Sequence, residues 1–439
     1  MDTQQTRIMN DKEKQNENSD VALEAQPEPA PSSPGPPPNG GFQAWLQVLG
    51  AFFLFFNSWG IINTFGAYQA FYESDLLSHH TSSEISWIGT FQGFLLVVFG
   101  VVSGPVFDQG HPRFLIITGT FLVVFGMMMT SLATEYWQLF LAQGAVVGLG
   151  AGFLFVPSVA IVATYFSTKR ALATGITASG GSIGSVIYPV VFHRLQPRIG
   201  FAWATRILGF IALATLLGSI LIMKTRLPPP KKSRRLIDPD GLGSLPFMIF
   251  NLALFLAFVG LYVPFFYIIL YAQSKLGLDE DLSFYMLAVV NGASVFGRII
   301  PGLLADKLGS LEVMTASAII SAVVAFCWLA INNLGGLVVF CIVYGFVSGA
   351  VVSLPPTVVA GFVPGLHVLG TWIGMGLLCA SMGLLIGNPI AGTLINVAEN
   401  KFTGGIIFSA AFIAAGALAL VVSRALRIRA AKASKTENN

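Results

Sequence analysis

Long apolar runs alternate with short polar segments along almost the whole 439-residue chain. Each run has about twenty residues or more, enough for a helix to cross a hydrocarbon core of roughly 30 Å. A segment that spans a bilayer alone must satisfy its own backbone hydrogen bonds, so each run predicts a helix rather than a barrel strand. We expect an all-α membrane protein with twelve transmembrane helices, at residues 43–71, 85–107, 114–133, 137–163, 171–192, 203–223, 244–271, 283–305, 313–331, 336–358, 369–396 and 404–423.

Polar segments divide the chain into five parts. Residues 1–42 include PEPAPSSPGPPP, a composition that buries too little apolar surface to fold, and they predict a disordered N-terminal tail. Residues 224–243 contain KTRLPPPKKSRR and predict a linker between two six-helix bundles, at 43–223 and 244–423. Residues 424–439 form a C-terminal tail.

A repeated motif supports two related halves. GPVFDQGHPR places Gly104 four residues before Asp108, and GLLADKLG places Gly302 four residues before Asp306. The two sites are 198 residues apart, close to the spacing between the first and seventh predicted helices. The halves are therefore expected to be parallel structural repeats.

Composition and charge agree with a multi-pass integral membrane protein. Charged residues make up 10% of the chain, against about 25% in soluble proteins, and the mean hydropathy is +0.73. Eighteen of the 24 lysines and arginines lie in the tails and even-numbered loops, four lie in odd-numbered loops, and two lie within spans. The positive-inside rule then puts both termini in the cytoplasm. The plasma membrane is the first expectation, with a vacuolar or other internal membrane as the alternative.

Arg298 is a charge inside an apolar span, about 6 Å past its centre. A guanidinium at that depth costs several kcal/mol against lipid, so it should face protein or a wet cavity. Asp and Glu are missing from the middle of every predicted span. An organic anion is one expected partner, since the planar guanidinium suits a carboxylate. The alternative is that Arg298 reaches helix carbonyls or acidic groups at the cytoplasmic end.

Other polar and aromatic residues are candidates for substrate contacts. Asn291 and Ser294 share a helix face with Arg298, since the three follow an i, i+3, i+7 pattern. Asn57 and Asn63 lie in the first span and Tyr267 in the seventh. Ordinary hydrogen bonds between helices and aromatic packing are the alternatives for these side chains.

Glycine and proline predict local features of the helices. Gly144, Gly148 and Gly152 repeat at i+4 in one span, as do Gly180 and Gly184 in the next, and small faces allow close helix approach. Pro264 is expected to loosen the middle of the seventh span.

Two segments carry a family resemblance. GGFQAWLQVLGAF (40–52) and YFSTKRALATGITASGGSIG (165–184) resemble signature segments of the monocarboxylate porter family of the major facilitator superfamily, especially its filamentous-fungal branch. The resemblance implies a transporter whose bundles rock to give alternating access. Animal lactate-type members carry a lysine and an aspartate where this chain has Asn63 and Ser294, and only Arg298 matches. Anion recognition is therefore expected, without the usual proton-carrying pair.

The resemblance also implies conformational latches at the cytoplasmic helix ends. Asp108 with Arg113, and Asp306 with Lys307, would bridge helices in one conformation and release in the other. Lys169 and Arg170 begin the fifth span and are gating candidates in the same way. A plain helix-end ion pair, worth about 0–1 kcal/mol, is the alternative.

The leading hypothesis is a transporter of a small, monocarboxylate-like organic anion. The alternatives are an efflux pump for a fungal secondary metabolite, an importer of a larger compound such as riboflavin, and a nutrient sensor that moves nothing. An enzyme is not expected, because phosphate-loop, H-E-x-x-H and G-x-S-x-G motifs are missing.

The expected partners are a small-molecule substrate and membrane lipid. We expect no cofactor, metal or nucleic acid. A coupling proton stays open, with Glu73, His193 or a substrate carboxyl as its carrier, and so does an accessory membrane protein.

Overall fold

The computed structural model describes residues 38–166, 170–226, 236–363, 368–397 and 399–437. This described part is helical, apart from loops and an isolated bridge between Asn396 and Lys401. The helices are α2 (Phe42–Asn63), α3 (Phe65–Phe71), η1 (Tyr72–Leu76), α4 (Ser82–Asp108), α5 (Pro112–Thr130), α6 (Tyr136–Leu139), η2 (Phe140–Val147), α7 (Gly148–Tyr165), α8 (Arg170–Ile222), α9 (Pro239–Gly243), α10 (Leu245–Leu261), α11 (Val263–Leu270), η3 (Tyr271–Lys275), α12 (Glu280–Leu308), α13 (Ser310–Cys327), η4 (Trp328–Ala330), α14 (Leu334–Ser353), α15 (Pro355–Ala360), α16 (Leu369–Thr393) and α17 (Thr403–Glu437).

The predicted helical membrane fold is confirmed. Within the described residues, eleven continuous helical stretches are long and apolar enough to cross a membrane. One of them belongs to α8, whose 53 residues are broken at Gly200, where φ is 80°. An unbroken helix of that length would measure about 80 Å, so α8 holds the two spans that the sequence predicts at 171–192 and 203–223.

The helices form two sets that meet along three seams. In the N-terminal set, α8 packs against α2 and α5, and α7 packs against α2, α4 and α5. In the C-terminal set, α10 packs against α16 and α17, and α12 packs against α14. The sets meet where α4 contacts α16, α8 contacts α12, and α3 contacts α11.

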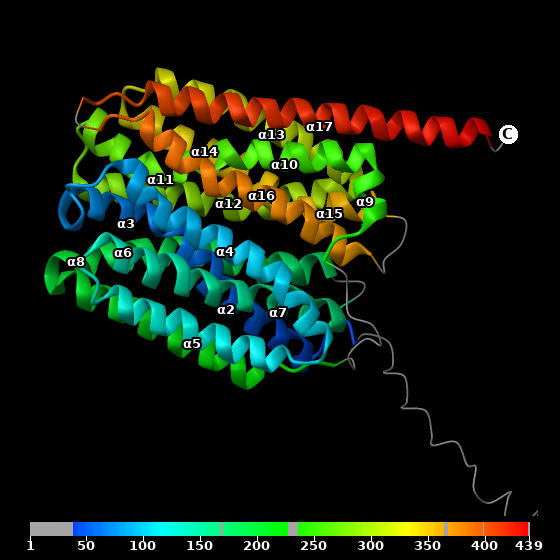
Figure 1. Cartoon of the computed structure of the whole chain (residues 1–439), viewed down its shortest axis with the longest axis horizontal. Coiled ribbons are helices and arrows are strands. Elements are labelled where there is room, and N and C mark those ends of the chain that lie inside the picture. Colours follow the sequence, from blue (N-terminus) through cyan, green and yellow to red (C-terminus); the bar gives the residue numbers. More distant parts are fainter. Residues whose placement is uncertain (1–37, 167–169, 227–235, 364–367, 398, 438–439) are drawn as a thin grey trace, which may run out of the picture. The chain divides into compact units, whose positions relative to one another are not determined.

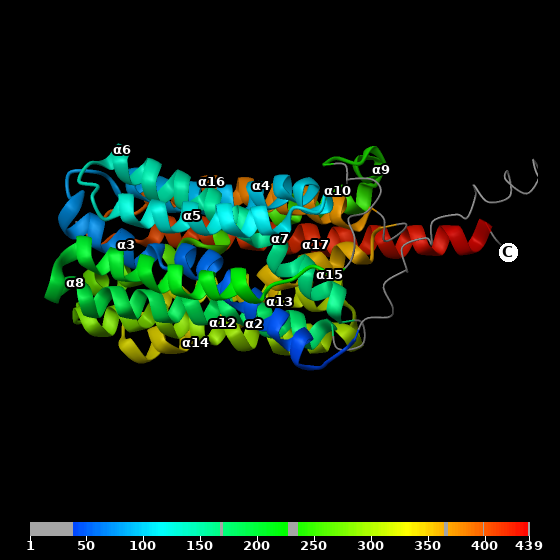
Figure 2. The ribbon, with the colours of Figure 1, turned by 90° about the horizontal axis from the view of Figure 1, so that it is seen from below.

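The helical assembly has two ends that carry different elements. The end that carries α3 and α11 is called the distal end here, and the end that carries α9, α15 and the C-terminus is called the terminal end (Figure 1). The second view again places α3 at the opposite end from α9, α15 and the C-terminus (Figure 2).

Matching breaks interrupt one helix in each half. Helix α2 ends at Asn63 and α3 begins after Thr64, whose hydroxyl donates to the Gly60 carbonyl at 2.7 Å. Helix α10 ends before Tyr262, and α11 begins with Pro264 in its first turn, so the predicted effect of this proline is confirmed. The breaks are 198 residues apart, the same offset as the repeated motif.

Glycines bring neighbouring helix backbones together, as the i+4 spacing predicts. A β-carbon at Gly148 would lie 2.8 Å from the Gln92 carbonyl oxygen of α4, and one at Gly152 would lie 3.0 Å from the Leu95 carbonyl oxygen. In the same way, a β-carbon at Gly184 of α8 would lie 3.0 Å from the Cα atom of Gly60 in α2.

Gly297→Ala is expected to destabilise the folded protein, because a β-carbon there would overlap the Phe346 carbonyl oxygen where α12 packs on α14. Overpacking of this kind costs about 1–3 kcal/mol. The matched control is Gly218→Ala within α8, where nothing lies within 4 Å of the new methyl group and helix propensity favours alanine. The melting temperature of purified protein in detergent should fall for the first variant and not for the second; an equal response would contradict the tight contact.

Candidate functional site

A narrow cleft lies where the two halves face each other, beside the breaks in α2 and α10. It has a volume of about 10 Å³, close to that of one water molecule. In this conformation the cleft is therefore closed around its lining side chains. Its lining residues are Asn63, Tyr262, Phe265, Ser294, Arg298, Ser348, Gly349 and Val352.

Arg298 is the cation of this cleft, and it has no counterion among the residues that the structure describes. Its Nε is buried without a hydrogen-bond partner, and it forms no ion pair with any described residue. Arg206, the other arginine predicted within a span, is instead partnered: its Nε donates to Ser131 Oγ at 3.0 Å, and its guanidinium lies 5.0 Å from the Trp203 ring centre. Of these two arginines, Arg298 is therefore the one with unused donor capacity, at its buried Nε.

Arg298 also reaches from one half to the other. Its Nη1 lies 3.6 Å from the position that a β-carbon would take at Gly181 of α8. Close by, Ser182 of α8 and Ser294 of α12 share a hydrogen bond of 3.4 Å between their hydroxyl oxygens. The guanidinium therefore occupies a place where movement of the halves would change its surroundings.

Asn63 of the cleft lining and Asn291, seven residues before Arg298 on α12, have unused acceptors. Asn63 Nδ2 donates to Ser185 Oγ at 3.0 Å and Asn291 Nδ2 donates to the Leu287 carbonyl at 2.9 Å, but the Oδ1 atoms of both are buried without partners. Buried polar atoms are normally paired, and sites that bind polar ligands are a common exception. With Arg298 and Asn63 the cleft can thus offer both a cationic donor and a neutral acceptor.

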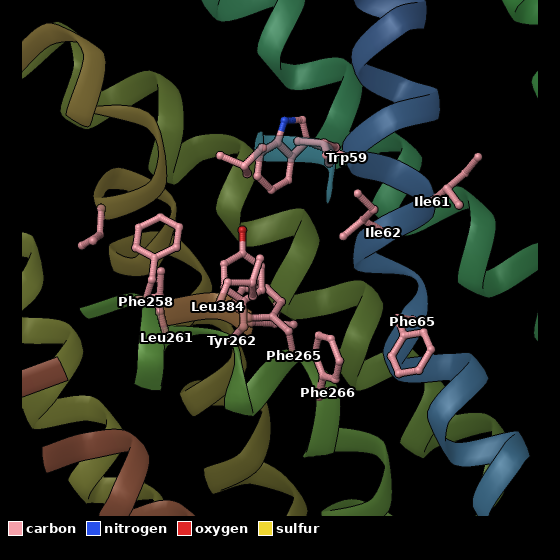
Figure 3. Packing of buried hydrophobic residues seen from close by; sticks show 14 of the residues in the cluster. Trp59, Ile61, Ile62, Phe65, Phe258, Leu261, Tyr262, Phe265, Phe266 and Leu384 are labelled. Atoms are coloured by element: carbon pink, nitrogen blue, oxygen red, sulfur yellow. The ribbon is translucent and has the colours of Figure 1, made fainter. Parts of the chain in front are cut away.

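The aromatic residues Tyr262 and Phe265 line the cleft, and Trp59 lies near them. Trp59 of α2 is 7% exposed and packs edge-on against Phe155, with 6.3 Å between the ring centres. Figure 3 shows the Tyr262 hydroxyl pointing toward Trp59, with Phe265 beside it. These rings would suit a flat, apolar ligand body next to a charged group.

Two predicted contact residues lie in other environments. Asn57 donates to Thr215 Oγ1 at 2.8 Å and accepts from the Tyr188 hydroxyl at 2.6 Å, within the N-terminal half. Tyr267 donates to the carbonyls of Asn388 at 3.2 Å and Ser82 at 3.4 Å, at the distal end. In this conformation the described cleft brings together Arg298, Ser294 and Asn63, whereas Asn57, Tyr267 and Asn291 do not line it, and the role of all six as substrate contacts stays a prediction.

A charged contact between the halves lies at the distal end and was not predicted from the sequence. His193 Nε2 lies 2.6 Å from Asp281 Oδ1, Arg194 Nη1 lies 3.3 Å from Asp281 Oδ2, and Arg194 also donates to the Tyr285 hydroxyl. The His193 ring stacks on Phe284 at 4.1 Å between centres. We call this α8–α12 contact the distal seam. His193 and Asp281 are 88 positions apart in the sequence, so no local pattern reveals the contact.

The gating candidates that the structure describes lie at the terminal end. Arg113 and Lys307 are exposed there, whereas the side chains of Asp108, Asp306 and Arg170, and all of Lys169, lie outside the described residues. Their latch role stays a prediction. At the motif glycines Gly104 and Gly302, no described atom from outside the local helix backbone lies within 4 Å of the position that a β-carbon would take.

Direct hydrogen bonds between the halves lie elsewhere. Among the described residues they occur at the distal end, as from Ser83 Oγ to the Pro389 carbonyl at 2.8 Å, or near the middle, at Ser182 and Ser294. The conformation is therefore one in which the distal end is closed.

Curated relatives cover most of the chain. It is 44% identical over 358 residues to the MFS-type transporter dbaD of Emericella nidulans, which covers 82% of this chain and 80% of the relative. It is 40% identical to the aspyridones efflux protein apdF of the same organism (82% and 74% covered). It is 39% identical to the agnestins efflux protein AgnL12 of Paecilomyces divaricatus (88% and 89% covered). None of these three is named a monocarboxylate porter, so that branch of the resemblance is not supported.

A solved structure shares the fold. An aspartate-to-alanine mutant of the nucleoside transporter NupG superposes with a TM-score of 0.67 at 16% identity, covering 87% of this chain and 99% of that one. Residues 48–364 match the family model described as Major Facilitator Superfamily. The chain therefore belongs to the major facilitator superfamily and is a multi-pass membrane transporter.

Proposed function

We propose that this transporter exports an acidic, largely apolar organic metabolite, and that Arg298 binds its anionic group. The observation that carries the proposal is a half-buried arginine without a counterion among the described residues, in a cleft walled by Tyr262 and Phe265. A guanidinium removed from water gains most from an anion that it can hold with two parallel hydrogen bonds. Ser294 and Asn63 would orient the polar end of the substrate, while the rings enclose its apolar body.

Export of a metabolite replaces transport of a monocarboxylate as the leading hypothesis for the function. Two relatives that cover most of this chain are named as efflux proteins for aspyridones and agnestins. Their names support the alternative that the sequence left open, an efflux pump for a secondary metabolite. The acidic character of the substrate rests on Arg298 and not on those names.

The proposed orientation follows from the charges. Both termini and the linker carry the excess of lysine and arginine, so we place the terminal end in the cytoplasm of a plasma-membrane protein and the distal end outside. The two halves, at 43–223 and 244–423, would rock about the cleft while residues 224–243 connect them. A closed distal end then corresponds to a conformation that loads substrate from the cytoplasm.

The terminal-end charges would act when the transporter turns outward. Asp108 with Arg113, and Asp306 with Lys307, would close the cytoplasmic side as the distal end opens, together with Lys169 and Arg170. Each such pair would contribute about 0–1 kcal/mol, so the latches would bias the equilibrium without locking it.

Inside-out membrane vesicles that contain the protein should accumulate an aromatic carboxylic acid and should accumulate its uncharged primary amide far less. The reason is that only the acid offers an anion to Arg298. The measurement is uptake of the two radiolabelled compounds, with vesicles that lack the protein as the control. Equal uptake of acid and amide would reject the anionic substrate class, and no uptake of a panel of aromatic acids that vary in size would reject export of such acids.

A further inference from the structure

Glu73 is an acidic side chain in η1 at the distal end, and both of its oxygens are held by neutral donors. Gln69 Nε2 donates to Oε1 at 2.6 Å, and Ser82 Oγ donates to Oε2 at 2.8 Å. Glu73 forms no ion pair with any described residue. It is a partly buried carboxyl group without a cationic partner in the described part of the chain, an arrangement in which loss of water disfavours the charged form.

The carboxyl group is connected to the contact between the halves. Gln69 Nε2 also donates to the Ser82 carbonyl at 3.1 Å, and the same carbonyl accepts from the Tyr267 hydroxyl of α11 at 3.4 Å. The next residue, Ser83, donates to the Pro389 carbonyl of α16 at 2.8 Å. Glu73 therefore fixes the first turn of α4 at the point where this turn meets the opposite half.

This hydrogen-bond cluster lacks one donor. Gln69 is fully buried, and its Oε1 has no partner. A buried acceptor without a donor costs about 1–3 kcal/mol. Protonation of Glu73 would add one O–H donor to this cluster and would remove its uncompensated negative charge while the distal end is closed.

We propose that Glu73 is a proton-binding site of the transporter, which takes up one proton from the distal solution as the distal end closes and returns it as this end opens. The step is a reversible protonation of the carboxylate, and no other bond changes. Opening would separate Tyr267 and Pro389 from α4 and admit water, which stabilises the ionised form. Proton concentration on the distal side would thus set how long the transporter faces that side.

Other titratable groups on the surrounding elements must be distinguished from Glu73. Its own segment carries Tyr72, which donates to Gln143, and the exposed Asp75. The loop and start of α4 carry His80 and Glu84, which lie 3.3 Å apart. Helix α11 contributes Tyr267, and α8, which packs against α3, contributes His193 of the distal seam.

The test measures the distance between two spin labels on the protein in nanodiscs. The labels are attached at Ser78→Cys and Asn332→Cys, which are exposed loop positions at the distal ends of the two halves. The three native cysteines are replaced by alanine. With Glu73 present, acidification should shift the distances toward the closed state, with the closed-to-open ratio rising by up to about tenfold per pH unit, the limit for one linked proton. Glu73→Gln should hold the short distance at every pH, because the amide is uncharged.

Two variants act as controls. Glu84→Gln changes a half-exposed carboxyl eleven residues further along the chain and should keep the pH response of the parent. Glu73→Asp keeps a carboxyl group and should restore a response. An unchanged response in Glu73→Gln would overturn the proposal and leave His193 as the group to examine, and a Glu73→Gln protein that stays open would overturn it too. Because no substrate is added, these outcomes do not depend on the export of acids.

Discussion

Arg298→Ala is expected to lower transport of aromatic acids by about 10- to 100-fold while leaving transport of the matched amides within a few-fold of the parent. The range corresponds to the loss of a hydrogen bond to a charged group, about 1.5–3 kcal/mol. The anion would then enter a cleft whose remaining polar lining, including Ser294 and Asn63, is neutral. The measurement is initial uptake into inside-out vesicles, expressed as the ratio of acid to amide.

This ratio separates a lost contact from a lost fold. A variant that folds poorly lowers both rates together and leaves the ratio unchanged. Arg206→Ala is the matched control, because it removes an arginine that is already satisfied by Ser131 and Trp203. Arg298→Lys should give an intermediate ratio, since the ammonium keeps the charge and loses the planar pair of donors. An Arg298→Ala ratio equal to that of the parent would remove this side chain from substrate binding.

The twelve-helix architecture could be predicted because the bilayer imposes a length on every span. Apolar runs have to reach across roughly 30 Å, and the breaks between them are polar, so hydropathy alone locates the helices. Close packing at Gly148 and Gly152 could be predicted for a similar reason, since residues four apart share a helix face whatever the neighbour is. The helix break at Pro264 could be predicted because it follows from the covalent structure of proline itself and not from distant contacts.

The candidate site could be predicted only in part. Arg298 is recognisable because a charge at membrane depth is costly wherever it points, and Ser294 follows from the helix face. Asn57 makes hydrogen bonds with Thr215 and Tyr188, which lie more than 100 positions away in the sequence. A single sequence gives no signal for such contacts. The distal seam is hidden for the same reason, because charged residues at helix ends are ordinarily expected to face water.

A reversible crosslink across the distal seam is expected to lower the transport rate by more than tenfold. His193→Cys and Asp281→Cys place two thiols on α8 and α12, where the parent side chains lie 2.6 Å apart. In a background without the native cysteines, a short dithiol-reactive bis-methanethiosulfonate would join the halves while the distal end is closed. Substrate loaded from the cytoplasm could then no longer leave, and reduction with dithiothreitol should restore the rate of the untreated variant.

The double variant weakens the seam before any reagent is added, so its untreated rate is the reference. Each single cysteine variant, treated in the same way, should lose less than twofold, because one modified thiol cannot bridge the halves. The extent of crosslinking is read from intact-protein mass. If fully crosslinked protein still moves the aromatic acid at the untreated rate, separation of α8 from α12 is not part of the cycle. The release path would then have to open along the α4–α16 contact, where Ser83 meets Pro389.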